Sequence, residues 1–204
     1  MVRRLSVAVL AVALALPPRP LAAQTPPEPV DLIDLAQRYC IGPDGDHELT
    51  WSRAVRDGYV ELSPEDFPNL RLPGARRLRG FTRMTDGIEL RILTAVNRIS
   101  GGGQGETPFH LCWVSADPFE RAAVDRELGG WLGVGRFRQA GAWVHAWTPG
   151  EEGGRRSVSR REFQRRGMAI AREDGMRLVL TNQHGRMVAI TYMTPVEGCA
   201  DWCY

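Results

Sequence analysis

Lysine is absent from the sequence, and all 26 basic residues are arginine. This absence excludes a phosphate-binding-loop lysine, a Schiff-base lysine, a lysine that holds pyridoxal phosphate and a Ser-x-x-Lys nucleophile pair, because a guanidinium cannot replace the amine in any of them. A Gly-x-Ser-x-Gly nucleophile elbow is also missing. The glycine-rich residues 101–107 lead into a predicted strand rather than a helix that would hold an anion, so they predict a flexible loop.

No apolar run is long enough to cross a bilayer. Residues 5–16 carry no charge, but as a helix they would extend only about 18 Å, against about 30 Å of hydrocarbon. They follow Arg3 and Arg4 and precede Ala22 and Ala23, an arrangement typical of a signal peptide that is cut after Ala23. No cysteine lies near this cut, so lipid attachment is not expected. We predict an exported protein, secreted or periplasmic, that is soluble after cleavage and has no stable membrane anchor.

The predicted cleavage divides the chain into three segments: a signal peptide at 1–23, a proline-rich leader at 24–29 and a single α+β domain at 30–204. The chain has 26 basic and 24 acidic residues, and three of the arginines belong to the predicted signal. Because nucleic-acid binding calls for a strong basic excess, we predict no nucleic-acid partner.

Four cysteines, Cys40, Cys112, Cys199 and Cys203, would enter an oxidising compartment. An even number there indicates two disulfides, with three possible pairings. We favour Cys40 with Cys112 and Cys199 with Cys203, because the last two lie close together in a tail that has little else to hold it. The spacing of Cys199 and Cys203 is one residue longer than that of a redox-active Cys-x-x-Cys pair, so we predict structural disulfides.

Helical signals occur in four places. Apolar residues recur at helical spacing over 30–40, and a second helix is predicted from the N-cap Asp46 to Gly58, with Leu49, Trp51 and Val55 buried. A capping Asp117 followed by Pro118 predicts a third helix that ends at Gly129 and Gly130. Ser159 and Glu162 form a capping box that opens a fourth, ending near Gly175.

Strand signals fill the intervals between the helices. Residues 77–84 and 88–99 flank the turn dipeptide Asp86-Gly87 and predict a hairpin. Further strands are predicted at 109–115, where Phe109, Leu111 and Trp113 share one face, at 141–148, and in a hairpin at 176–182 and 187–194. The predicted order is ααβββαβαββ: an α+β fold with a largely antiparallel sheet of about five or six strands and helices mainly on one face. The third helix is the one place where a parallel crossover is conceivable.

A candidate ligand-binding face lies on the strand at 141–148. Trp143, His145 and Trp147 alternate there and so point to the same side of the sheet. If that side is open, two indoles beside an imidazole can stack on a sugar or another planar ligand. If it faces the helices, the tryptophans belong to the core.

Histidines give a weak signal for metal binding. His47-Glu48 begins like a His-Glu-x-x-His motif, but Trp51 stands at the second ligand position. His110 and His145 lie on separate predicted strands and could converge as metal ligands, although the ligand set is incomplete. We predict no metal and no cofactor.

The sequence contains one local run of positive charge, between residues 155 and 172. On the predicted fourth helix Arg161, Arg165 and Arg172 line one exposed face that can meet an anionic polymer or lipid headgroups. The alternative is a solvated helix face with no specific partner.

These observations favour a non-catalytic protein of the cell envelope that binds an unidentified ligand or protein partner. One alternative is a small exported hydrolase, with or without a metal, that uses His110 and His145. Another is a structural or inhibitory envelope protein that acts through its arginine surface. The sequence does not settle the oligomeric state.

Overall fold

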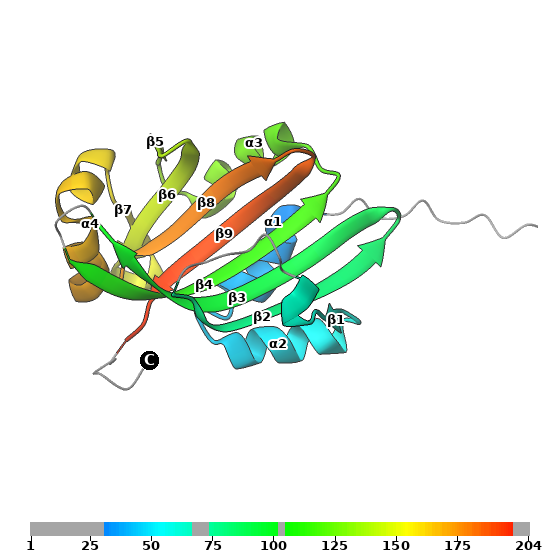
Figure 1. Ribbon diagram of the computed structural model, residues 1–204. Helices are drawn as coiled ribbons and strands as arrows, with labels where there is room; N and C mark the ends of the chain where they lie inside the picture. Colours follow the sequence, from blue (N-terminus) through cyan, green and yellow to red (C-terminus); the bar gives the residue numbers. More distant parts are fainter. Residues whose placement is uncertain (1–30, 67–73, 102–104, 198–204) are drawn as a thin grey trace, which may run out of the picture.

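The computed structural model of the protein describes residues 31–66, 74–101 and 105–197 (Figure 1). The predicted signal peptide and leader, Cys199 and Cys203 all lie outside these residues. The helices are α1 (Leu32–Ala36), continued by a π-helical turn (Gln37–Ile41), α2 (His47–Arg56), α3 (Arg121–Leu132) and α4 (Arg160–Asp174), with short 3-10 turns at Pro64–Asp66 and Glu151–Gly153. The strands are β1 (Val60–Glu61), β2 (Arg76–Thr85), β3 (Ile88–Ser100), β4 (Glu106–Asp117), β5 (Arg136–Gln139), β6 (Ala142–Pro149), β7 (Arg155–Ser157), β8 (Arg177–His184) and β9 (Met187–Pro195).

The nine strands among the described residues belong to one sheet in the order β1-β2-β3-β4-β9-β8-β6-β5, and β7 pairs with β6. Every pairing among the described strands is antiparallel, which confirms the predicted α+β class with an antiparallel sheet. β4 and β5, which α3 connects, are separated by β9, β8 and β6 and therefore run in the same direction, as the sequence allowed for this helix. The sheet exceeds the predicted five or six strands because β1, β5 and β7 have only two, four and three residues. Strands this short carry too few residues for a period-two pattern.

The predicted hairpin turns are present. Asp86 and Gly87 have φ values of 50° and 79°, which close the tight turn between β2 and β3. Gly185, with φ of 61°, closes the turn between β8 and β9. β3, β4 and β9 lie side by side at the centre of the sheet, where their long registers hold the core.

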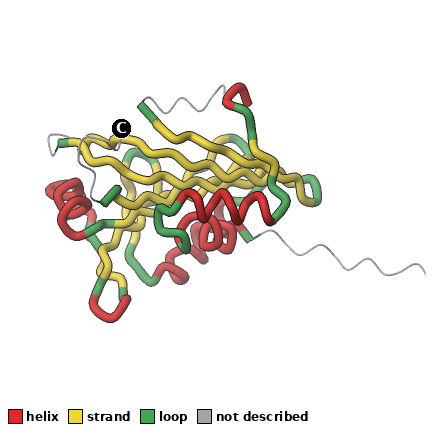
Figure 2. The backbone as a smooth tube through the Cα atoms, turned by 90° about the horizontal axis from the view of Figure 1, so that it is seen from below, coloured by secondary structure: helices red, strands yellow, loops and turns green. Residues whose placement is uncertain are grey.

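Among the described helices, α1, α2 and α3 cover one face of the sheet and α4 packs on the other, so the prediction of helices mainly on one face holds except for α4. α1, α2 and α3 share a core with Cys112, Val114 and Ile190 on one face. α4 packs on the opposite face, where Met168 and Ile170 meet Leu178 and Met193. Figure 2, which views the sheet from below, shows most of the helical layer on one side, with α4 at one end. α4 therefore leaves part of its face of the sheet without a helix.

The inward side of α2 differs from the prediction. Trp51 is buried as expected, but Leu49 is exposed and Val55 is 60% exposed. The buried positions are Thr50 and Ala54, because two hydrogen bonds set the rotation of the helix: Thr50 Oγ1 donates to the Tyr39 carbonyl, and Trp51 Nε1 donates to Thr94 Oγ1. These polar anchors rotate α2 away from the orientation that its apolar residues alone indicate.

The boundaries predicted for α3 are wrong at both ends. β4 continues to Asp117, which precedes a cis peptide bond to Pro118, and the helix begins only at Arg121. It passes through Gly129 and Gly130 and ends at a left-handed Gly133. The extra turn buries Leu132 beneath the sheet beside Val124 and Leu128, and this burial outweighs the poor helix propensity of the two glycines.

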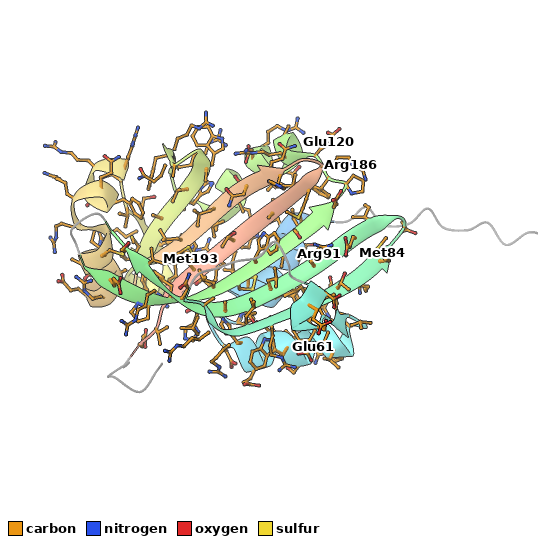
Figure 3. All side chains as sticks on the ribbon, viewed as in Figure 1. Glu61, Met84, Arg91, Glu120, Arg186 and Met193 are labelled. Atoms are coloured by element: carbon orange, nitrogen blue, oxygen red, sulfur yellow. A yellow bond between two sulfur atoms is a disulfide. The ribbon has the colours of Figure 1, made fainter. Side chains whose placement is uncertain are left out.

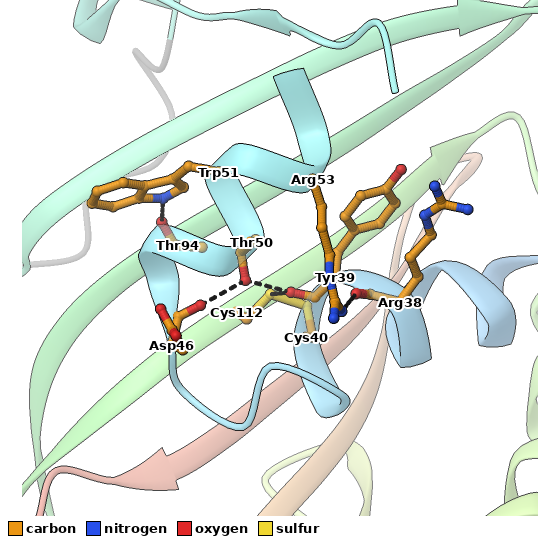
Figure 4. The surroundings of a disulfide bond; sticks show 9 residues. All are labelled: Arg38, Tyr39, Cys40, Asp46, Thr50, Trp51, Arg53, Thr94 and Cys112. Carbon is orange, nitrogen blue, oxygen red and sulfur yellow. Dashed lines mark hydrogen bonds between the residues drawn. A yellow bond between two sulfur atoms is a disulfide. The ribbon is translucent and has the colours of Figure 1, made fainter. Parts of the chain in front are cut away.

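The disulfide between Cys40 and Cys112 joins the π-helical turn to the middle of β4 (Figure 4). It is the pairing favoured from the sequence, and it closes a sequence separation of 72 residues. Beside it, the Tyr39 carbonyl accepts a hydrogen bond from Thr50. The disulfide therefore fixes α1 and α2 to the same strand. In the described part of the chain, no helix combines the length and the apolar character needed to cross a membrane.

Candidate ligand-binding cavity

A cavity of about 330 Å³ lies on the sheet face that carries α4. It extends across β2, β3, β4, β9 and β8, and most of its lining is apolar. The lining residues are Leu78, Leu93, Thr94, Ala95, Asn97, Ile99, Leu111, Trp113, Asn182, His184, Met187, Ala189, Thr191 and Met193.

The lining follows from the strand pattern. Successive side chains of a strand point to opposite faces, so Leu111 and Trp113 of β4 face the cavity while Cys112 and Val114 face the helical layer. On β9, Thr191 and Met193 take the cavity face for the same reason. A hydrophobic interior on both sides of the central strands is what makes them apolar at nearly every position.

The cavity extends both along the strands and across them. At one end of the cavity, Asn182 of β8 pairs with Ala189 of β9, which in turn pairs with Ser115 of β4. At the other end, Asn97 of β3 pairs with Phe109 of β4. The six intervals between Phe109 and Ser115 extend about 20 Å along the strand. Leu78 of β2 and Asn182 of β8 lie four strand spacings apart, about 19 Å across the sheet, so a volume of about 330 Å³ forms a shallow groove on this face.

Polar side chains stand at both ends of the cavity. Asn182 and His184 lie toward the β8–β9 turn, and Asn97 lies toward the far end of β3. Between them, Leu93, Trp113 and their neighbours are apolar except for Thr94 and Thr191. The arrangement suits a ligand with an apolar chain and a polar group at its end.

Trp143, His145 and Trp147 share one face of β6, as their spacing predicts, but that face lies against the α3 side of the core. Trp147 is 4% exposed and tilts against Tyr192, and His145 is 2% exposed with Nδ1 3.3 Å from the Val134 carbonyl. Burial lowers the pKa of His145, so it stays neutral. Protein side chains fill this face, and the structure gives no support to a ligand stacking there.

Trp143 is the outermost residue of that face. It is half-buried, with the guanidinium carbons of Arg136 and Arg138 at 4.4 Å and 5.3 Å from its ring centroid. These two arginines occupy the surface on which a planar ligand would stack. The third residue of the predicted site is therefore covered as well.

His110 and His145 do not converge. β9 and β8 lie between β4, which carries His110, and β6, which carries His145, so the two histidines are about 14 Å apart across the sheet. His110 lies instead against His47, with ring centroids 4.9 Å apart. No cluster of three or more potential metal ligands occurs among the described residues. The structure thus gives no geometric support to His110 and His145 as a joint metal site.

His47, buried at the start of α2, and the half-buried His110 of β4 form a pair. Burial, reinforced by the neighbouring His110, lowers the pKa of His47 to about 4. Burial, with a contribution from Arg77, also lowers the pKa of His110. Neither ring nitrogen of His47 has a hydrogen-bond partner in the described structure. Both rings therefore serve as neutral core groups at pH 7.

Arg161, Arg165 and Arg172 are exposed on α4, as predicted. Arg172 also reaches the start of the central strand β4, where Nη1 donates to Thr107 Oγ1 at 3.0 Å. Arg161 and Arg165 lie one helical turn apart on the outer side of α4, away from the cavity.

The sequence contained part of the signal for the cavity. The alternation of Phe109, Leu111 and Trp113 defines the correct face of β4. What sequence reasoning missed is that Ala189 and Thr191, nearly 80 residues later, complete the same wall. Comparison of the chain with protein-family models, curated proteins and solved structures finds no match.

Proposed function

We propose that the protein is a non-catalytic binding protein that holds a small ligand with an apolar chain in the cavity on the sheet. The supporting observation is the cavity itself, which is apolar along its middle and polar at its ends. At about 30 Å³ for each water-sized group, its volume of about 330 Å³ accommodates a chain of about ten non-hydrogen atoms. Sites of this size and composition are typical of small-molecule binding.

The affinity should depend on chain length. Each methylene that enters the cavity contributes about 0.8 kcal/mol, or about fourfold in Kd. Once the cavity is full, further methylenes remain in water and contribute little. A ligand with about ten chain atoms should therefore bind nearly as tightly as any longer one.

The experiment uses N-phenyl-1-naphthylamine, an uncharged dye that fluoresces in apolar surroundings. We expect the purified protein to enhance its fluorescence and straight-chain alcohols to displace it. Thr191→Trp places an indole in the cavity and should weaken dye binding at least tenfold. Met84→Trp adds the same indole to an exposed site at the far end of β2 and should leave binding unchanged (Figure 3).

Equal dye binding by both variants would show that the dye sits elsewhere and would overturn the proposal. A second pair guards against misfolding: Trp113→Ala enlarges the cavity, and Trp143→Ala removes a half-buried indole outside it. Only the first of these should change the affinity for the dye.

Export to an oxidising compartment is part of the same proposal. The disulfide between Cys40 and Cys112 supports it, because structural disulfides persist mainly outside the reducing cytosol. Mass spectrometry of the protein from a cell-envelope fraction should find a mature chain that begins at Gln24. Recovery of the intact chain, with its first 23 residues, from the cytosol would contradict this part.

A further inference from the structure

The charges of the protein are separated between one end of the sheet and the rest. Residues 136–172, which form β5, β6, β7 and most of α4, contain nine arginines and three glutamates, a net charge of +6. The other described residues carry a net charge of −6. We call the outward-facing arginines of this region the basic edge: Arg136, Arg138, Arg155, Arg156, Arg160, Arg161, Arg165 and Arg166.

The elements that carry the basic edge are neighbours in space. β5 and β7 both pair with β6, and Gln164 of α4 donates to Gln139 at the end of β5. Figures 1 and 3 show these elements together at one end of the sheet, with the side chains of α4 projecting outward. Arg136 and Arg138 lie over Trp143 on the α3 side of this edge, whereas Phe137 between them packs against α4 on the other side, so the positive charge continues around the edge from one face of the sheet to the other.

Part of this charge is not neutralised within the protein. Arg156 and Arg166 pair with Asp174 and Glu173, at 3.7 Å and 3.2 Å. For Arg161 and Arg165, no ion pair is found in the part of the chain that the structure describes. Both are exposed and lie on one side of α4, so both can reach an external anionic group.

Tryptophans stand among these arginines. Trp131 is 37% exposed, and the guanidinium carbon of Arg155 lies 5.4 Å from its ring centroid. The guanidinium groups of Arg136 and Arg138 lie over the ring of Trp143 in the same way. Indoles prefer the boundary between water and hydrocarbon, where their apolar rings and polar N–H are both accommodated. A surface that combines them with arginines fits an anionic bilayer better than a fully hydrated polyanion.

The basic edge is also next to the cavity. Ile99, Leu111 and Met193 line the cavity and belong to the core cluster that α4 covers. Met193 lies toward α4 in Figure 3. The same helix thus presents arginines outward and borders the end of the cavity with its inner side.

We infer that the basic edge docks the protein on an anionic phospholipid bilayer. Its arginines contact the headgroup phosphates, and Trp131 enters the interfacial region. The docking follows from charge and aromatic distribution alone. That the bilayer also supplies or receives the chain held in the cavity rests in addition on the proposed function.

The test measures sedimentation of the full-length mature protein with vesicles of phosphatidylcholine containing 30% phosphatidylglycerol, against vesicles of phosphatidylcholine alone. We expect binding to the anionic vesicles only, weakened by raising the salt from 50 to 500 mM. Replacing Arg161 and Arg165 with Gln should lower the partition coefficient about thirtyfold, since each arginine near the surface contributes about fivefold.

The matched control replaces Arg56 and Arg186 with Gln. It removes the same charge from exposed sites outside the basic edge, and Figure 3 places Arg186 at the opposite end of the sheet. Binding should change less than twofold. Equal losses in both double variants, or equal binding to neutral vesicles, would overturn the inference. So would binding to soluble poly-aspartate without binding to vesicles, which would indicate an acidic protein partner.

The two proposals fail separately. The variant with Gln at 161 and 165 should bind N-phenyl-1-naphthylamine normally in solution, because neither arginine lines the cavity. Conversely, Thr191→Trp should still sediment with anionic vesicles. Normal dye binding together with absent vesicle binding would reject the docking surface and leave the cavity standing.

Discussion

The stability of the protein should fall below pH 6.5 because of His47. This side chain is 4% exposed, and its pKa drops from 6.5 to about 4 on folding, mainly through burial and secondarily through His110. The unfolded chain then binds the proton at a higher pH than the folded chain does. The stabilisation is therefore complete above about pH 6.5 and is lost as the pH falls toward 4.

The magnitude follows from the two pKa values. Between pH 7.5 and pH 5, a group that titrates at 6.5 when unfolded and at about 4 when folded removes about 2 kcal/mol from the free energy of unfolding. The lowered pKa of His110 acts in the same direction. Replacing His47 with Leu removes the titrating group and leaves no hydrogen-bond partner behind, since neither ring nitrogen has one in the described structure.

The assay is urea unfolding, followed by circular dichroism, of the wild type and of His47→Leu at pH 7.5 and pH 5. We expect the loss of stability on acidification to be smaller in the variant by about 2 kcal/mol. The same loss in both proteins would refute the reasoning. A titration of the histidine resonances by NMR that placed His47 near 6.5 would refute it independently.

Three further predictions concern the framework. Replacing Cys40 and Cys112 with Ala should lower the free energy of unfolding by about 4 kcal/mol in guanidinium, because the disulfide closes a sequence separation of 72 residues; a loss below 1 kcal/mol would contradict this. Tyr192→Phe removes the hydrogen bond that its hydroxyl donates to Asp44 and should lower the free energy of unfolding by about 2 kcal/mol, while the ion pair between Asp44 and Arg177 remains. Ser159→Ala removes the N-cap of α4 and should lower the stability by about 1 kcal/mol, which thermal unfolding can measure.

Local chemistry made much of the fold predictable. Asp86-Gly87 specifies its turn, and the Ser159–Glu162 capping box starts α4 where expected, since both signals act within four residues. The start of α3 was not predictable in the same way. Pro118 satisfies the local pattern for a helix start, but β4 continues to Asp117 and pairs with β3 there. The pairing of β4 with β3, distant in the sequence, therefore overrides the local helix-start signal at Pro118.

The site required information that the sequence does not hold locally. The alternation of Trp143, His145 and Trp147 predicted a shared face correctly, but only the packing of α3 determines that this face is core. The alternation of Leu111 and Trp113 is equally regular, yet it lines a cavity because α4 covers only one end of its face. The same alternating pattern thus forms core on β6 and lines a cavity on β4, and the placement of the helices determines which of the two occurs.

The most direct test of the ligand-binding proposal is the affinity of the protein for straight-chain alcohols of 6 to 16 carbons, measured by displacement of N-phenyl-1-naphthylamine. A cavity of about 330 Å³ predicts that Kd falls about fourfold with each added methylene up to about ten chain atoms and then stays constant. A Kd that kept falling across the whole series would indicate adsorption to an open apolar surface, and the absence of displacement at any length would indicate no such site. Either result would contradict the cavity as a binding site for an apolar chain.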